Sequence, residues 1–160
     1  MKTLNATLDS NLETESQELD NSIPILKLSD INKNTSLKNY NDGITLIFFY
    51  MTGCGHCERF KPAFNRVYKN AQRIFKNIPI HIVAIDITTK EGSEIQNLFN
   101  KYQKNFMVKG VPKVVGYKNG KFYAVYAKGN DNYRKPSDVL SFIYGIIQNV
   151  PVEKDDKAAS

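Results

Sequence analysis

The chain has 160 residues, 41% of them hydrophobic, which is enough for one folded domain with its own core. Its net charge of +6 comes from scattered lysines and arginines rather than from a basic run, so we expect a solvated surface and no nucleic-acid partner. Only two cysteines are present, too few for a disulfide-stapled secreted scaffold, and no apolar stretch is long enough to predict a membrane-spanning helix.

The first 22 residues are polar and acidic, and their isolated leucines follow no period, so we expect residues 1–22 to form a flexible arm. No apolar core follows Met1 and Lys2, which argues against a secretory signal and favours a cytoplasmic location. The folded domain is expected to span residues 23–150, and a flexible charged tail is expected at 151–160.

The next stretch predicts only weak elements. A short strand is expected at 25–28, and Ser29 or Asp30 is a candidate cap for a weak helix that runs to about Tyr40. The Asn-Asp-Gly sequence at 41–43 then breaks the chain before the first strong element begins.

The strongest element is the unbroken apolar run at 45–50, which predicts a buried strand covered on both faces. A small-residue break at Thr52 and Gly53 leads from this strand into the sequence Cys-Gly-His-Cys at 54–57. A helix is expected to follow, because its apolar residues recur at the spacing of one helix face: Phe60, Phe64, Val67, Tyr68, Ala71, Ile74 and Phe75. Pro62 should kink this helix about one turn after the second cysteine.

The second half of the chain continues the alternation of strands and helices. We expect a strand at 80–87, a helix that starts at Ser93 or Glu94, and a strand at 113–117. An Asn-Gly turn joins that strand to a returning strand at 121–127. After a polar loop at 129–135, Ser137 should cap the last helix, which ends before Pro151. The order predicts one α/β domain, with helices on both faces of a mostly parallel sheet that ends in an antiparallel hairpin.

The two cysteines lie where the buried strand turns into a helix. Only a thiolate attacks a disulfide, and unpaired N–H groups at a helix N-terminus stabilise one. Cys54 at the mouth of the turn should be the attacking sulfur, and Cys57, inside the helix, the resolving sulfur. His56, when protonated, would add a positive charge between them. The alternatives are an inert structural disulfide or half of a metal site; His81, the other histidine, is expected to be a packed core or edge residue.

These residues resemble the thioredoxin superfamily, and the Cys-Gly-His-Cys sequence resembles the active site of the catalytic domains of protein disulfide isomerase. The resemblance covers residues 23–150 and includes Pro62, the Gly-Val-Pro sequence at 110–112, the Asn-Gly hairpin and Gly129. It implies a thioredoxin fold and reversible exchange with protein or peptide thiols, without a cofactor or metal. A monomer is expected, with no membrane contact, and a redox partner enzyme is one partner that the resemblance allows.

The resemblance also assigns roles to further residues. Gly55 and Pro112 belong to the catalytic site, and Gly53, Pro112 and the backbone of Val111 should contact an extended substrate. The bond between Val111 and Pro112 should be cis, beside the cysteines. Arg134 resembles an arginine that approaches the resolving cysteine, although a solvated loop residue is the alternative. Glu58 is either a substitute proton acceptor or a residue that complements the helix dipole.

Three positions depart from the family pattern. The tryptophan that usually precedes the first cysteine is Gly53 here. The buried acid of the central strand, which helps to deprotonate the resolving cysteine, is Phe48, and its lysine partner on the next strand is Ala84. Loss of both charges avoids a buried unpaired charge, and it leaves Cys57 without its usual proton acceptor.

The sequence therefore predicts a thiol–disulfide oxidoreductase that acts on protein thiols, with oxidase or isomerase character because of His56. One alternative is a disulfide reductant served by a reductase. Another is a domain that binds clients through the surface around Val111 and Pro112 with little turnover, an alternative that the missing acid keeps open.

Overall fold

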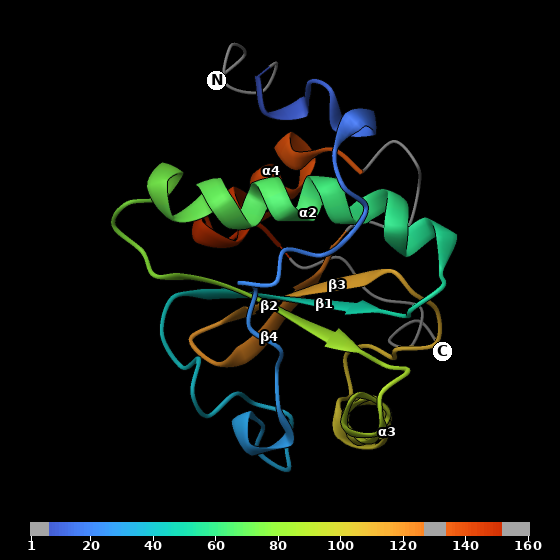
Figure 1. Ribbon diagram of the computed structural model, residues 1–160. Helices are drawn as coiled ribbons and strands as arrows, with labels where there is room; N and C mark the ends of the chain where they lie inside the picture. The colour runs from blue at the N-terminus through green and yellow to red at the C-terminus, as the bar shows by residue number, and fades with distance from the viewer. Residues whose placement is uncertain (1–6, 127–133, 152–160) are drawn as a thin grey trace.

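A four-stranded sheet forms the centre of the computed structural model, which describes residues 7–126 and 134–151 (Figure 1). Its strand order is β2-β1-β3-β4. Strand β1 (Ile44–Tyr50) is parallel to β2 (Ile80–Asp86) and antiparallel to β3 (Lys113–Lys118), which forms an antiparallel hairpin with β4 (Lys121–Val125). The expected α/β fold with its edge hairpin is confirmed, but only one strand pair is parallel.

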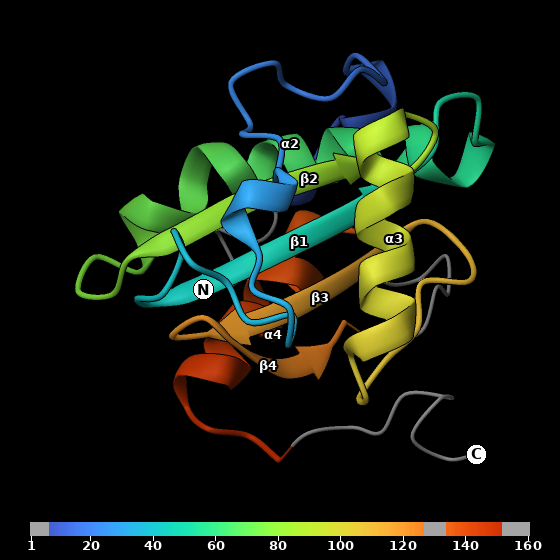
Figure 2. The same ribbon diagram turned by 90° about the horizontal axis from the view of Figure 1, so that it is seen from below.

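Helices cover both faces of this sheet. Helices α2 (Gly55–Ile74) and α4 (Pro136–Ile147) lie side by side on one face, and α3 (Lys90–Tyr102) crosses the other, as Figure 2 shows from below. Two short 3₁₀ helices, Leu12–Thr14 and Leu28–Asp30, precede β1. None of the helices in the described ranges combines the length and apolar character that crossing a membrane requires.

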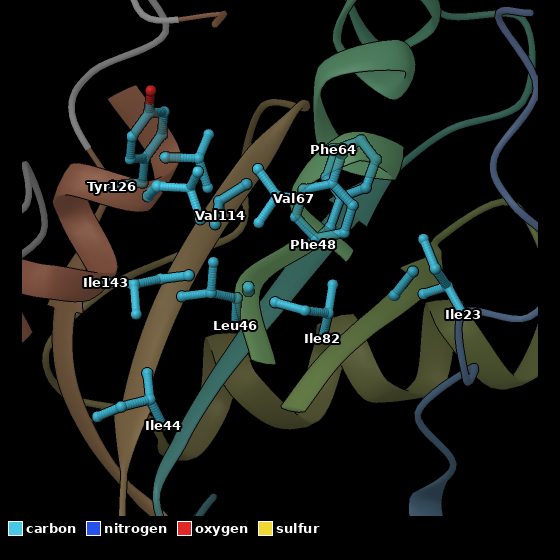
Figure 3. Close-up of a cluster of buried hydrophobic side chains, with 14 of the residues drawn as sticks. Ile23, Ile44, Leu46, Phe48, Phe64, Val67, Ile82, Val114, Tyr126 and Ile143 are labelled. Carbon is cyan, nitrogen blue, oxygen red and sulfur yellow. The ribbon is translucent and has the colours of Figure 1, made fainter. Parts of the chain in front are cut away.

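The side chains of β1 divide between two hydrophobic cores. Ile44, Leu46 and Phe48 point towards α2 and α4 (Figure 3), whereas Ile47 and Phe49 point towards α3. Successive residues of a strand face opposite sides of the sheet, so an apolar run without alternation fills both cores. This confirms the expectation of a strand that is buried on both faces.

The segment before β1 differs most from the expectation. Leu8 is buried in the same hydrophobic cluster as residues of α2 and α4. The Arg66 guanidinium of α2 donates to the carbonyl oxygens of Leu8 and Ser10 and to the Glu15 carboxylate. The Asp9 carboxylate accepts from the backbone N–H and hydroxyl of Ser137. The described part of the expected flexible arm, 7–22, is therefore attached to α2 and α4 by these contacts, although most of its residues are exposed. A single buried leucine and contacts to distant side chains leave no periodic signal in the sequence.

Residues 25–40 form neither the full strand nor the helix that was expected. Ile25 makes only an isolated parallel bridge to Ala84, and Ile31 bridges to Leu37 across a tight turn. Short polar side chains in this turn bond to one another and to the nearby backbone; among them, the Ser36 N–H donates to the Asn34 side chain. Such local bonds compete with helix formation.

Two helix starts also differ from the sequence expectation. Helix α3 begins at Lys90 rather than at residue 93 or 94, because the Thr89 hydroxyl accepts from the Gly92 N–H and caps the helix. Helix α4 begins at Pro136, so Ser137 lies inside it and binds Asp9 instead of acting as the cap. The turn between β3 and β4 is as expected, with positive φ at both residues of its Asn-Gly pair. Gly129 and most of the expected polar loop lie outside the described residues.

Candidate active site

The candidate site forms at the end of β1, where the chain turns into α2. Gly53 has a φ of +80°, a conformation that residues with a side chain rarely adopt, and it allows the tight turn between strand and helix. Cys54 is the N-cap residue of α2 and is half-buried, whereas Cys57 lies in the first turn and is fully buried. The half-buried cysteine at the helix mouth and the buried one inside the helix lie where the sequence placed them.

Cys54 is held between the helix N-terminus and a distant loop. Its sulfur accepts a hydrogen bond from the Cys57 backbone N–H at 3.2 Å and, as a thiol, donates to the Val111 carbonyl oxygen at 3.8 Å. The Val111–Pro112 bond is cis, as the resemblance implies. The fold thus brings Gly53, Cys54 and Val111 together, although the last lies 57 residues from the cysteine. A thiolate at Cys54 would keep the N–H donor and the positive end of the helix dipole.

His56 lies against the guanidinium groups of two arginines. Its Nδ1 lies 2.8 Å from a guanidinium nitrogen of Arg59 and 3.0 Å from one of Arg134. A guanidinium only donates hydrogen bonds, so the Nδ1 atom is the acceptor in this arrangement. The two arginines therefore bring permanent positive charge to the residue between the two cysteines. Arg134 therefore lies beside His56. Arg59 is three residues after His56 on the helix, a spacing that brings two side chains together and that could have predicted this contact from the sequence.

Cys57 is strongly biased towards the thiol form. Burial, together with a hydrogen bond to the adjacent Cys54 and the charge of that cysteine, raises the pKa of Cys57 to about 12. The Met51 backbone and the Lys61 ammonium act in the opposite direction. At neutral pH this cysteine is therefore protonated, and its deprotonation limits any step in which it must attack.

Phe48 fills the place of the family's buried acid with an aromatic cluster. Its side chain is completely buried and its ring centroid lies 4.7 Å from that of Phe64 and 5.4 Å from that of Phe60 (Figure 3). Ala84 is its partner in the register of β1 and β2. The two positions that hold an acid and a lysine in the family thus lie side by side on neighbouring strands as an apolar pair. Neither side chain can accept a proton from Cys57.

A carboxylate that the sequence reading did not single out lies at the end of β2. Asp86 is the register partner of Tyr50 and accepts hydrogen bonds from Thr52 at 2.8 Å and from the Thr88 backbone at 2.9 Å. Burial opposes its ionisation, but the bonds from Thr88 and Thr52 and the nearby Lys61 charge lower the pKa of Asp86 below its ordinary value. An ionised carboxylate therefore lies beside the strand end that carries the cysteine turn.

His81 and Glu58, the remaining candidate residues, have contacts or positions that are ordinary for structural residues. His81 is near the start of β2, at the opposite end from Asp86, where its Nε2 lies 2.9 Å from the Asp42 carboxylate. Glu58 lies in the first turn of α2, where a negative charge complements the helix dipole. Among the residues that the structure describes, no three His, Cys, Asp or Glu side chains gather as a metal ion would require.

Comparison with known proteins shows the family of the chain. The sequence model of the family "Thioredoxin" matches residues 24–141. A Drosophila melanogaster protein, "Thioredoxin domain-containing protein 5 homolog", is 25% identical over 96% of this chain, and "Protein disulfide-isomerase TMX3" of Xenopus laevis is 27% identical over 76% of it. The matches cover only 33% and 23% of those two proteins, so this chain is much shorter than either relative.

Solved structures show the same fold at low identity. Human ERp44 superimposes with a TM-score of 0.59 and 16% identity, over 79% of this chain and 30% of that one. The first two thioredoxin domains of Saccharomyces cerevisiae Eps1p give a TM-score of 0.59 and 14% identity, over 79% and 41% of the two chains.

Proposed function

Because the chain belongs to the thioredoxin family, we propose that it is a thiol–disulfide oxidoreductase that exchanges disulfides with protein or peptide thiols through Cys54 and Cys57. One observation carries this proposal. The Cys54 sulfur caps α2, accepts the Cys57 N–H and lies 3.8 Å from the carbonyl of Val111, beside the cis bond. A nucleophile, a stabilising donor and a main-chain group able to bind an extended peptide therefore meet at one point.

The exchange proceeds in two steps. In the first, the Cys54 thiolate attacks a client disulfide, a Cys54–client bond forms, and the other client sulfur leaves with the electron pair and takes up a proton. In the second, Cys57 loses its proton to solvent and its thiolate attacks Cys54. The Cys54–Cys57 bond forms and the client leaves as a second thiolate. Two electrons pass to the client, and the reverse sequence oxidises a client dithiol.

The oxidising or isomerising direction is the finer part of the proposal. The guanidinium groups of Arg59 and Arg134 converge on His56, between the two cysteines in the sequence. Positive charge at the helix N-terminus stabilises the Cys54 thiolate, which exists only in the reduced protein. Stabilisation of the reduced form makes the disulfide a better oxidant.

A second candidate function is client capture with little turnover. What favours it is the environment of Cys57, where burial raises the thiol pKa to about 12 and Phe48 offers no carboxylate. Slow attack by Cys57 would leave a client attached to Cys54 for longer. This candidate uses the same first step and differs only in the rate of the second.

Three measurements test the proposal. The protein should catalyse reduction of insulin disulfides by dithiothreitol, and Cys54→Ser should abolish the activity. Cys57→Ser should accumulate Cys54–client mixed disulfides that are visible on a non-reducing gel. Equilibration with glutathione should give a reduction potential of about −180 mV for an oxidase or isomerase, whereas a reduction potential of about −270 mV would indicate a reductant. No mixed disulfide with Cys57→Ser would contradict the proposal, and mixed disulfides without insulin turnover would favour client capture.

A further inference from the structure

Lys61 is a buried lysine that the exchange steps described above do not use. Only 9% of its surface is exposed, although lysine is almost never buried without a partner. It lies four residues after Cys57 in α2, and residues at this spacing share one face of a helix. Cys57 and Lys61 therefore both face the interior beside the end of β1.

The surroundings of Lys61 hold its charge in place. Its Nζ lies 4.7 Å from the centroid of the Tyr50 ring, whose face attracts a cation. Tyr50 is the register partner of Asp86, whose pKa is lowered in part by the Lys61 charge, although burial opposes that shift. The backbone of Met51, the next residue after Tyr50, bonds to the Cys57 sulfur. The ammonium contacts Tyr50 and the buried sulfur bonds to the neighbouring Met51, so both groups lie at the same strand end.

We propose that Lys61 is a positioning residue for the exchange reaction, and that its ammonium, held against the Tyr50 ring, stabilises the Cys57 thiolate in the resolving step. The inference rests on the proposed function. In this role the Lys61 charge opposes the effect that burial has on the Cys57 thiolate. The central strand of this chain carries Phe48 in place of an acid and gives Cys57 no such help.

The charges around Cys57 agree with this role. Among the described residues, the titratable groups at this end of the sheet include Tyr50 of β1, Cys54 of the turn, Lys61 of α2 and Asp86 of β2, while Glu58 and the His56–arginine group lie in the first turn of α2. Of the charges that act on Cys57, that of Cys54 raises its pKa and that of Lys61 lowers it. Once Cys54 is bonded to a client it carries no charge, so Lys61 then acts on Cys57 without this opposition.

The proposed step balances without a further reactant. Cys57 gives its proton to solvent, its sulfur forms a bond to Cys54, and the bond from Cys54 to the client breaks with the electron pair on the client sulfur. Lys61 keeps its proton throughout and acts only through its charge. Since reduced Cys57 is a thiol at neutral pH, Lys61 should change the rate of this step and leave the redox potential at neutral pH unmoved.

The test follows release of a fluorescent peptide from the Cys54 mixed disulfide by stopped flow between pH 6 and 10. The rate of the wild-type protein should rise with pH. In Lys61→Met the rising limb should run parallel and about tenfold lower, the change that one pKa unit at Cys57 produces. Lys61→Arg should restore the rate. Lys69→Met, an exposed lysine of the same helix, should leave it unchanged.

A second variant and a stability measurement separate this role from a structural one. Lys61→Gln keeps a polar side chain, and if Lys61→Met does not fold, the same tenfold loss is expected of Lys61→Gln at an unchanged thermal midpoint. Coincident profiles for wild type and a folded Lys61 variant, or no restoration by Lys61→Arg, would overturn the inference and leave the proposed function standing. Failure of the wild-type protein to form the mixed disulfide would instead overturn both.

Discussion

Phe48→Glu is the most informative single change, because it places the family's acid into this apolar core. Phe48 is completely buried, and its ring lies within 5.4 Å of three other rings, those of Tyr50, Phe60 and Phe64. Loss of a buried phenylalanine costs about 3 to 5 kcal/mol. Its register partner Ala84 has no group that could bond to the new carboxyl, and an unsatisfied buried polar group adds about 1 to 3 kcal/mol.

The free energy of unfolding should therefore fall by roughly 4 to 8 kcal/mol in Phe48→Glu, against about 1 to 2 kcal/mol in the apolar control Phe48→Leu. The difference should also depend on pH. Burial raises the pKa of a carboxyl above its unfolded value of about 4.3, so the folded state binds more protons between the two values. Stability of Phe48→Glu relative to Phe48→Leu should then decrease by about 1.4 kcal/mol for each pH unit in that window.

Urea unfolding of both variants at pH 5, 6 and 7, followed by far-UV circular dichroism, measures this difference. The reasoning would be refuted if Phe48→Glu were no less stable than Phe48→Leu. It would also be refuted if the gap between the two variants narrowed as the pH rises, because that would mean that the core accepts an ionised carboxylate at this position.

Three further results are expected. Limiting iodoacetamide at pH 8 should label Cys54 and leave Cys57 free, because burial raises the pKa of Cys57 to about 12, and peptide mass mapping that found equal labelling would contradict the assignment of the two sulfurs. Arg66→Met should lower the free energy of unfolding by about 2 to 4 kcal/mol, because it removes charged hydrogen bonds to carbonyl oxygens of the N-terminal segment. Thermal or urea denaturation measures this change, and a loss below about 0.5 kcal/mol would mean that the segment adds little to the stability of the fold. Gly92→Ala should cost at least about 2 kcal/mol, because a Cβ there would lie 1.8 Å from a backbone oxygen at the end of β2, whereas Gly110→Ala meets open space and should be neutral; equal effects would show that α3 can shift away.

The sequence alone determined the elements whose signals are local. The apolar run of β1 required two covered faces, the Asn-Gly pair required a tight hairpin, and the spacing of the cysteines after a strand placed one at a helix mouth and the other inside. Each of these signals depends on residues within a few positions of one another, where strand and helix periods and turn conformations act directly.

The resemblance to the family predicted features that involve residues far apart in the chain. The cis bond at Pro112 and the apolar pair of Phe48 and Ala84 follow from matching positions, and the structure places both where that match implied. Neither could come from local physics, since an isolated X–Pro bond favours trans and an apolar residue in a buried strand carries no sign of a missing acid.

Only the tertiary structure decided which charges surround the cysteines. Arg134 lies 78 residues from His56, and Asp86 reaches the site through the pairing of β2 with β1. Lys61 reads in the sequence as an ordinary helix lysine, yet its burial against Tyr50 sets its charge beside Cys57. The effect of a charge depends on its distance and its exposure to water, and chain folding fixes both between residues that no local pattern connects.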